Sequence, residues 1–204
     1  MTDLHLILVD PKPALCRAFQ AAFKDLPNVE IVNGYFERLP TFDCMVSAAN
    51  SFGLIDGGVD AAIINFFGDA LERRVQQRIV DDYLGEQPIG TSIIVETQHP
   101  KHPFLAHTPT MRVPMSIAET ENVYMAMWAM LLAVRQHNRP HNQPIRVIAC
   151  PGLGTATGHM FFQEAARQMA LAYQHYLAPP KHISWTYADE RHAQVRRRVK
   201  FDAE

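Results

Sequence analysis

The chain has 204 residues, of which 48% are hydrophobic and 20% are charged, the composition of an ordinary globular protein. This length supports one domain with a substantial core, so we expect a single domain over residues 1–204. The formal net charge of −2 argues against a basic nucleic-acid-binding surface. No segment approaches the roughly 20 apolar residues that cross a bilayer. We therefore expect neither a nucleic acid nor a membrane as partner.

The cysteines and the N-terminal sequence indicate the cellular compartment. Cys16, Cys44 and Cys150 are odd in number, far apart and embedded in apolar runs. This pattern predicts reduced, buried thiols and neither a disulfide framework nor a metal site. The first residues lack the basic start and long apolar run of a secretory signal, so we expect a cytoplasmic protein. The histidines of residues 99–107 are separated by prolines, which predicts a surface loop and no metal cluster.

Short apolar runs alternate along the chain with segments of helical periodicity. The strands predicted in chain order are Leu4–Val9, Val29–Phe36, Cys44–Ala49, Ser92–Glu96, Phe104–Thr108 and Ile145–Cys150, with one further possible strand at Ile183–Tyr187. The helices have apolar positions spanning Leu15–Leu26, Val59–Asp82, Ile117–Val134 and Phe162–Tyr176. This alternation predicts an α/β protein built as a three-layer α/β/α sandwich.

The last part of the chain and the tryptophans show no functional pattern. The basic run Arg196–Lys200 is predicted to be the solvated end of a C-terminal helix. Trp128 and Trp185 are predicted to pack in the core or at its rim.

Two glycine-rich loops follow predicted strands, where ligands bind in sheets of this kind. In the first loop, Gly57 and Gly58 open a helix, whose free N–H groups and positive dipole end attract phosphate. Asn50, at the tip of a strand, offers a donor and an acceptor to sugar hydroxyls. Asp60 would repel an adjacent phosphate, so it is placed to face a ribose hydroxyl or a water that it activates. The alternative is that Asp60 only caps the helix.

The second loop, Gly152–Gly158, follows the strand that ends at Cys150. Its glycines permit close approach of a ligand to the backbone, and Thr155 and Thr157 supply hydroxyl donors for phosphate oxygens. Glycine-rich turns between strands and helices also occur for steric reasons alone. Two such loops in one small α/β domain favour a ligand with two phosphates that is bound from both sides.

These segments resemble the macro domain family. Asp43–Asn50 and then Gly57–Asp60 are similar to the family's apolar strand, NAAN-type tetrapeptide and GGVD-type helix start. Leu105–Met111 is similar to the central strand of the family, and Pro151–Gly158 resembles its second phosphate loop. The resemblance runs in the right order over residues 29–177 and implies a macro-like mixed central sheet with no cofactor or metal.

The resemblance implies ADP-ribose, or an ADP-ribosylated substrate, as the partner. The positions that it assigns to ligand contacts are Ala49, Asn50, Gly57, Gly58 and Val59 for the distal ribose and phosphate, and Gly154, Thr155, Ala156, Thr157 and Gly158 for the diphosphate. As in family members that cleave ADP-ribose from proteins or remove a 1″-phosphate, Asn50 would orient the distal ribose. Asp60 would position or activate a water. The resemblance thus implies an ADP-ribosyl hydrolase or ADP-ribose-1″-phosphate phosphatase.

The chain departs from the family pattern at several positions. Ser47 replaces the first Asn of the tetrapeptide, and Ala156 stands where the second loop often has glycine. Asp56 stands in place of another glycine and adds a carboxylate to the ribose loop, which could change the distal modification that is accepted. The acidic residue that usually meets adenine is Tyr35 here. Two candidates remain for this contact, the ring of Tyr35 by stacking and the carboxylate of Asp10.

Three other functions compete with hydrolysis. A non-catalytic ADP-ribose reader, or a sensor of a nucleotide signal, would use the same pocket without a placed water. A nicotinamide-dependent oxidoreductase would explain the glycine spacing of residues 152–158, but that fingerprint normally follows the first strand of its unit. The opening Leu6–Pro11 resembles a phospho-receiver domain, but Asn50 stands where a phosphorylatable Asp is required.

Overall fold

The computed structural model describes residues 4–55, 57–139 and 143–197. Its centre is a six-stranded sheet in the order β2-β1-β6-β3-β5-β4. The strands are β1 (His5–Asp10), β2 (Val29–Asn33), β3 (Cys44–Ser47), β4 (Ile93–Glu96), β5 (Phe104–His107) and β6 (Val147–Cys150). Strand β4 is antiparallel to β5, and all the other pairs are parallel. The sheet is therefore mixed, as the resemblance implied.

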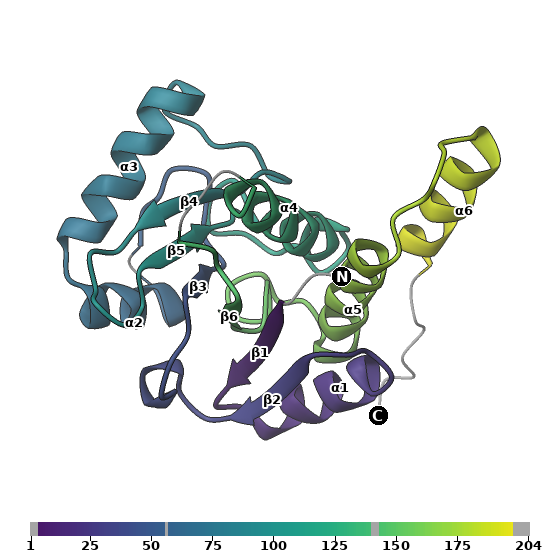
Figure 1. The fold of residues 1–204 in the computed structure, drawn as a ribbon, viewed down its shortest axis with the longest axis horizontal. Coiled ribbons are helices and arrows are strands. Elements are labelled where there is room, and N and C mark those ends of the chain that lie inside the picture. Colours follow the sequence, from purple (N-terminus) through teal and green to yellow (C-terminus); the bar gives the residue numbers. More distant parts are fainter. Residues whose placement is uncertain (1–3, 56, 140–142, 198–204) are drawn as a thin grey trace.

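Helices cover both faces of this sheet (Figure 1). The helices are α1 (Pro13–Phe23), α2 (Gly58–Phe67), α3 (Ala70–Tyr83), α4 (Asn122–His137), α5 (Phe162–Leu177) and α6 (Trp185–Arg196), with a short 3-10 turn η1 (Phe36–Arg38). Helices α1, α4 and α5 lie on one face, and α2 and α3 lie on the other, while α6 projects from the body. The predicted three-layer sandwich is confirmed. Among the described residues, no helix is long and apolar enough to cross a membrane.

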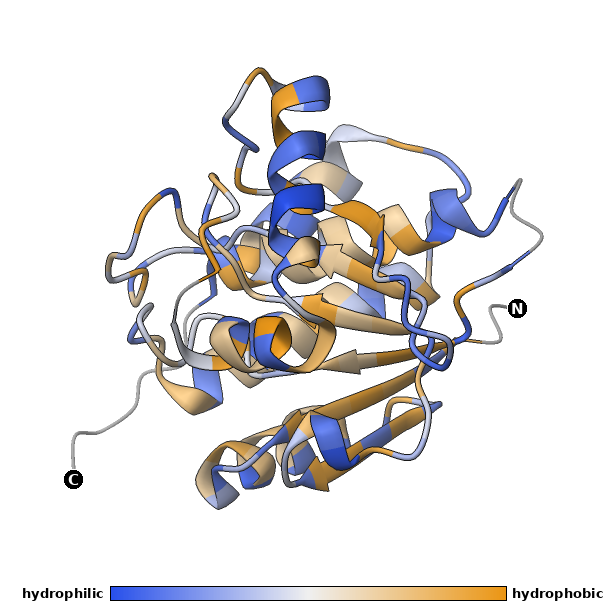
Figure 2. Ribbon diagram, turned by 90° about the vertical axis from the view of Figure 1, so that its left-hand side faces the viewer, coloured by the Kyte–Doolittle hydropathy of each residue, from blue (hydrophilic) through white to orange (hydrophobic). Residues whose placement is uncertain are grey.

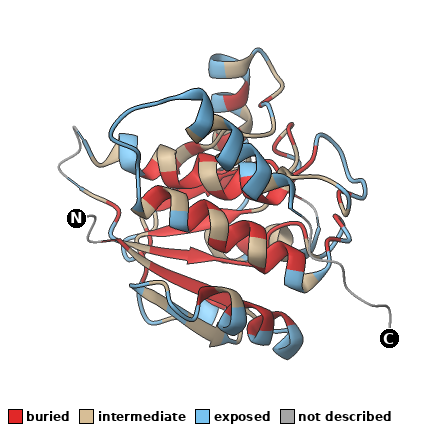
Figure 3. Cartoon of the chain, turned by 90° about the vertical axis from the view of Figure 1, so that its right-hand side faces the viewer, coloured by how far each residue is buried: buried red, intermediate tan, exposed pale blue. Residues whose placement is uncertain are grey.

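The alternation of strand side chains produces two cores. Leu6 and Leu8 of β1 pack with α1, α4 and α5, whereas Ile7 and Val9 pack with α2 and α3. Figure 2 shows the apolar strands between helices whose outer surfaces are hydrophilic, and Figure 3 shows the strands and the inner helix faces as buried. In β3, Met45 and Ser47 are two residues apart, so their side chains point to the same face of the sheet. Met45 packs on the side of α2 and α3, so Ser47 also points toward α2.

Several local predictions were wrong. The helix expected over Val59–Asp82 is two helices, because Gly68, with φ of 89°, ends α2 in a conformation that favours glycine. The possible strand Ile183–Tyr187 is the start of α6, where the Ser184 hydroxyl caps the helix by accepting a hydrogen bond from the Tyr187 amide at 3.2 Å.

The predictions for Trp185 and for the histidine segment also need correction, whereas the prediction for Trp128 is confirmed. Trp185 is 85% exposed at the start of α6, so it does not pack in the core. The Trp128 ring does pack against the core, and the Arg191 guanidinium lies 4.4 Å from its centroid. His102 is buried and stacks on the ring of Phe42, so only part of the histidine segment is a surface loop. The cysteine prediction is confirmed, since all three thiols are free and buried.

Candidate functional site

The sheet order brings three strand ends together. Strands β1, β6 and β3 are parallel neighbours, so their carboxyl ends meet at one edge of the sheet. Ligands bind at such edges in α/β proteins. The glycine loops after β3 and β6 both begin there, and Asp10 ends β1 beside them.

The two glycine loops face each other across one crevice. A cavity of about 90 Å³ is lined by both of them and by Met111 and Pro114. The predicted contacts on its wall are Ala49, Asn50, Gly57, Gly58, Val59, Asp60, Gly154, Thr155, Ala156, Thr157 and Gly158. An adjacent cavity of about 260 Å³ shares five residues with the first, namely Gly58, Val59, Gly152, Thr155 and Ala156. The two cavities therefore form one elongated site. Asp56 lies outside the described residues.

The first loop leaves open space in front of helix α2. Gly57 has an extended backbone (φ −141°, ψ 154°), and Gly58 has φ of 59°. A Cβ atom built at either glycine would meet nothing within 4 Å. The first N–H groups of a helix have no acceptor within that helix, and the dipole adds positive potential. The loop therefore presents polar N–H groups to a space in which an anion can lie.

Asp60 is held by a serine from the sheet. The Ser47 hydroxyl donates a hydrogen bond of 2.8 Å to Asp60 Oδ1, and Ser47 itself is fully buried. The side chain of Asp60 lines the first cavity from the first turn of α2. This contact fixes the carboxylate at the wall of the crevice, where it can meet a ribose hydroxyl or a water.

Asn50 shapes the first loop as well as lining the cavity. Its Oδ1 accepts hydrogen bonds from the amides of Phe52 (3.0 Å) and Leu54 (3.3 Å), and its Nδ2 donates to the carbonyl of Leu54 at 2.6 Å. These bonds use one of the two amide hydrogens. Asn50 thus fixes the turn at Leu54, and among the described residues its second amide hydrogen has no partner, so it can donate to a ligand.

The glycines of the second loop have a different role from those of the first. A Cβ atom at Gly154, which has φ of 68°, would lie 2.8 Å from Ile117, and one at Gly158 would lie 2.5 Å from the carbonyl of Gly154. The loop is closed by hydrogen bonds from Met160 N to Gly154 O (3.0 Å) and from Ile117 N to Gly158 O (2.8 Å). Thr155 Oγ1 donates to Gly152 O at 3.0 Å. Packing therefore requires glycine at these two positions whether or not a ligand binds.

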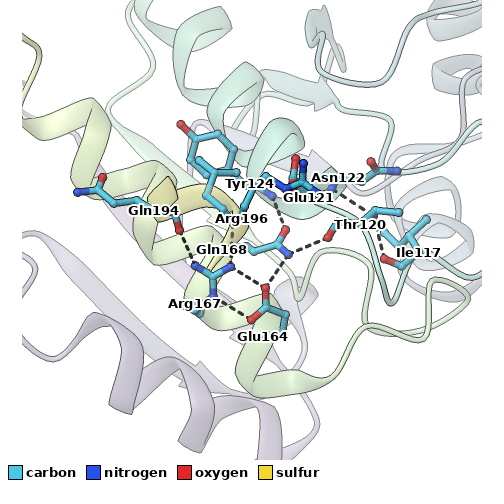
Figure 4. Close-up of polar contacts among 11 residues, drawn as sticks. Ile117, Thr120, Glu121, Asn122, Tyr124, Glu164, Arg167, Gln168, Gln194 and Arg196 are labelled. Atoms are coloured by element: carbon cyan, nitrogen blue, oxygen red, sulfur yellow. Dashed lines mark hydrogen bonds and ion pairs between the residues drawn. The ribbon is translucent and has the colours of Figure 1, made fainter. Parts of the chain in front are cut away.

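A buried polar network between α5 and the start of α4 stabilises the second glycine loop (Figure 4). Gln168 donates to the carbonyl of Thr120 (2.9 Å) and accepts from the Tyr124 amide (3.0 Å), which satisfies the start of α4. Glu164 accepts from Gln168 and from the guanidinium of Arg167. The Thr120 hydroxyl donates a hydrogen bond to Ile117 O at 2.8 Å, and the Ile117 amide donates one to Gly158 O. The network therefore extends to the second glycine loop.

The second cavity has an apolar wall with a few polar groups. Its lining includes Val9, Pro11, Phe36 and Met45, together with Asp10. Asp10 Oδ1 accepts a hydrogen bond from the Lys12 amide at 2.9 Å. This composition suits a flat aromatic base with polar edges.

Both candidates for the adenine contact lie at this second cavity. Tyr35 lines it but is 54% exposed, and the Arg38 guanidinium lies 5.4 Å from the centroid of its ring. The carboxylate of Asp10 lines the same cavity at the end of β1. Tyr35 and Asp10 therefore both remain candidates for the adenine contact.

A larger open groove of about 680 Å³ lies elsewhere, along β4 between α3 and α4. It shares no lining residue with the glycine loops and contains no feature that the sequence singled out. Within the described part of the chain, no group of three or more His, Cys, Asp or Glu side chains is arranged to hold a metal ion.

Sequence reasoning missed the role of Ser47, which holds Asp60 from behind the cavity wall, and two residues of the wall, Met111 and Pro114. The departure at Ser47 was visible, but its bond to Asp60 depends on the register of β3 against α2. Met111 and Pro114 follow β5, the next parallel strand of the sheet, so the rule that ligands meet strand ends would have found them.

Comparisons with solved structures give the same architecture. The Oceanobacillus iheyensis macrodomain with ADP is 25% identical, covers 70% of this chain and 73% of its own, and superimposes with a TM-score of 0.58. The macrodomain of Mycobacterium tuberculosis DarG is 18% identical, covers 69% and 86%, and has a TM-score of 0.57. The Trypanosoma brucei macrodomain in complex with ADP is 16% identical, covers 85% and 57%, and has a TM-score of 0.56.

Comparisons of sequence agree with this result. An uncharacterized protein of Aquifex aeolicus (strain VF5) is 28% identical over 142 residues, which are 70% of this chain and 78% of that protein. The model of the macro domain family matches residues 46–169, more than half of the chain, and this match includes both glycine loops. The chain belongs to the macro domain family.

Proposed function

We propose that this protein binds ADP-ribose, or a closely related ADP-containing nucleotide, along the crevice. The observation that carries the proposal is that both glycine loops line one cavity, with Asn50 and Asp60 on the same wall. The base would occupy the apolar second cavity, the diphosphate would lie between the loops, and the distal ribose would reach Asn50 and Asp60. Three unpaired, buried cysteines fit a protein of the reducing cytoplasm.

Related proteins support this choice of ligand. The Oceanobacillus iheyensis macrodomain has structures with ADP and, as a point mutant, with ADPR, and the Trypanosoma brucei macrodomain has one with ADP. The two cavities together fall near the lower end of the range of about 300–1,000 Å³ that is usual for small-molecule sites. An elongated nucleotide that leaves part of its surface exposed fits this space.

We further propose that the protein hydrolyses a bond at the distal ribose. Asp60 would accept a proton from a water while the oxygen of that water bonds to the electrophilic atom, carbon or phosphorus. The bond from this atom to the leaving oxygen then breaks, and the leaving group takes a proton from solvent. Ser47 supports this role because its hydrogen bond fixes one carboxylate oxygen of Asp60.

The test separates binding from chemistry. Calorimetric titration with ADP-ribose, ADP, AMP and NAD gives the ligand class, and we expect ADP-ribose to bind most tightly. Turnover is then measured on an ADP-ribosylated protein and on ADP-ribose-1″-phosphate. The variant Asp60→Asn keeps an acceptor for Ser47 but removes the base, so it should bind ADP-ribose and lose turnover by about 100-fold or more. The exposed, distant Asp25→Asn is the matched control.

Each outcome decides between the candidates. Turnover that Asp60→Asn abolishes and Asp25→Asn retains supports the hydrolase. Tight binding of ADP-ribose without turnover on either substrate supports the reader function, which the same crevice also fits. If none of the four nucleotides binds, the proposed ligand class is wrong.

A further inference from the structure

The groove of about 680 Å³ along β4 lies at the outer edge of the sheet, away from the glycine loops. All four residues of β4 line it, with residues of α3 on one wall and residues of α4 on the other. Strand β4 is the last in the sheet order, and within the described chain it pairs only with β5. Figure 1 shows β4 at this edge, between α3 and α4. We name this space the edge groove.

The hydrogen-bond pattern shows which backbone groups of β4 face the edge groove. In an antiparallel pair, residues that bond to the partner strand alternate with residues whose N–H and C=O point away from it. The Thr97 amide donates to the carbonyl of Pro103 at 2.8 Å, so Val95, two residues earlier, also bonds to β5. The N–H and C=O groups of Ile94 and Glu96 therefore point away from β5, into the edge groove.

The contacts of Arg74 confirm this orientation. Its Nε donates to the carbonyl of Glu96 at 3.0 Å, and its Nη2 donates to the carbonyl of Thr97 at 2.9 Å. Arg74 thus occupies one end of the edge. Among the described residues, no hydrogen bond reaches the N–H or C=O of Ile94. A strand edge with unpaired backbone groups is a template for pairing with another extended chain, and here the free position is Ile94.

The wall on the side of α4 offers an apolar contact. Ile94 and Phe104 pack with the core on this side of the sheet, and Ala133 of α4 lines the same groove. Gln136 and His137 line it as well. On an antiparallel strand, the residue directly opposite Ile94 would point its side chain to the same face as Ile94. That position therefore accepts an apolar side chain.

The wall on the side of α3 offers a positive charge. The Arg74 guanidinium bonds to the two carbonyls and to the amide oxygen of Gln98 at 3.4 Å, and all three acceptors are neutral. Within the described part of the chain no carboxylate pairs with it, whereas Arg78 on the same wall pairs with Asp82 at 2.7 Å. On an added strand, the neighbours of the apolar residue would point to this wall. A carboxylate at such a position complements the charge of Arg74.

We propose that the edge groove binds an extended segment of a partner protein, which pairs with β4 as an antiparallel strand and alternates apolar with acidic residues. Main-chain hydrogen bonds to Ile94 supply affinity, and the two walls select the side chains. A second copy of this chain fits less well, because its edge sequence Ser92–Glu96 (SIIVE) lacks this alternation and brings its own flanking helices. The edge groove shares no lining residue with the crevice, so this binding is independent of the proposed nucleotide.

The experiment measures the binding of synthetic peptides to the whole chain by calorimetry. The reference peptide is short, capped at both ends, and alternates valine with aspartate. One version is N-methylated at the central valine, whose N–H would face Ile94, and the matched version at the next aspartate, whose N–H would face away. The first methyl group should raise the dissociation constant at least about tenfold, and the second should change it by less than about twofold. Lysine in place of aspartate should abolish binding, because it brings a second positive charge to Arg74.

Two variants test the same site from the side of the protein. Ile94→Pro removes an N–H that points away from β5, a position at which an edge strand tolerates proline. Ile94→Val keeps this N–H and is the matched control. Ala133→Trp fills the edge groove from α4, and Ala21→Trp on the exposed part of α1 is its control. We expect Ile94→Pro and Ala133→Trp to weaken peptide binding at least about tenfold and both controls to retain it. Melting temperatures identify a folding defect, and if Ile94→Pro has one, Ala133→Trp decides.

Hydrogen exchange shows where the peptide lies, and we expect the bound peptide to slow exchange in residues 92–96. The inference is overturned if the reference peptide does not bind, if the two N-methylated versions bind equally, or if Ala133→Trp keeps full affinity. Light scattering tests the competing occupant. A dimer of the unmodified chain that Ile94→Pro dissociates and Ile94→Val does not would overturn the inference in favour of a second copy at this edge.

Discussion

Replacing glycine by alanine should stabilise the protein at Gly57, in the first loop, and destabilise it at Gly158, in the second loop. At Gly57 the backbone is extended and a Cβ atom meets nothing within 4 Å, so Gly57→Ala introduces no strain. Alanine also restricts the unfolded chain, which should stabilise the protein by about 0.4–1 kcal/mol. For a chain of this length, the melting temperature should rise by about 1–4 °C.

At Gly158 the same change meets backbone. The new Cβ atom would lie 2.5 Å from the carbonyl oxygen of Gly154 and 2.8 Å from Ile117. To relieve these close contacts the second loop must move, and this movement disturbs the hydrogen bond between Ile117 N and Gly158 O. An overpacked site of this kind costs about 1–3 kcal/mol, so the melting temperature should fall by about 2–12 °C.

Binding should weaken in both variants, for different reasons. In Gly57→Ala the methyl group occupies the space in front of the first amides of α2, and we expect the dissociation constant for ADP-ribose to rise at least about tenfold, or about 1.4 kcal/mol. In Gly158→Ala the second loop is displaced from the diphosphate. Thermal melts without ligand and calorimetric titration measure stability and binding separately. The reasoning is refuted if Gly57→Ala lowers the melting temperature by several degrees, or if it binds ADP-ribose as the unmodified chain does.

Three further predictions concern buried groups. Burial lowers the pKa of His107 to about 3, so the unfolded chain takes up a proton that the folded chain does not. The free energy of unfolding should fall by about 1.4 kcal/mol per pH unit between about pH 6 and 4, and His107→Gln should lack this part of the slope in urea titrations. Gln168→Leu should lower the free energy of unfolding by about 2–4 kcal/mol, because it leaves the buried Tyr124 amide and the partly buried Thr120 carbonyl without their partner. A loss below about 1 kcal/mol in the same titration would contradict this. Burial raises the pKa of all three cysteine thiols, so Ellman's reagent should label them quickly only after unfolding, and rapid labelling of the native chain would show that the thiols are accessible.

The sequence by itself determined most of the elements and their order. Strands β1, β3 and β6 are short apolar runs, and the helices have apolar residues at three- and four-residue intervals, so local periodicity specifies them. The glycine loops were also visible, because glycine and strand ends are local signals. The sequence could not show that the glycines of the two loops have different roles. Gly57 leaves space free, whereas Gly158 is required by contact with Gly154, and both appear as the same letter.

Local signals failed where two conformations were close in propensity. The segment 183–187 contains Ile and Trp, which favour strands, but the Ser184 cap and the contacts of Arg167 with the carbonyls of Gln194 and Val195 stabilise α6. Gly68 ends α2 by a positive φ that periodicity does not reveal.

Only the tertiary structure decided how the site is assembled. Strand β6 lies between β1 and β3, although the three are far apart in the chain, and this order places the two glycine loops face to face. Ser47 reaches Asp60 because alternation in β3 points it toward α2. The loop after β3 likewise contacts the loop after β5, through the bridge between Asn50 and Met111 and the hydrogen bond from the Ser51 amide to the Arg112 carbonyl. Periodicity records the neighbours of a residue along the chain, and these contacts depend on which strands pair.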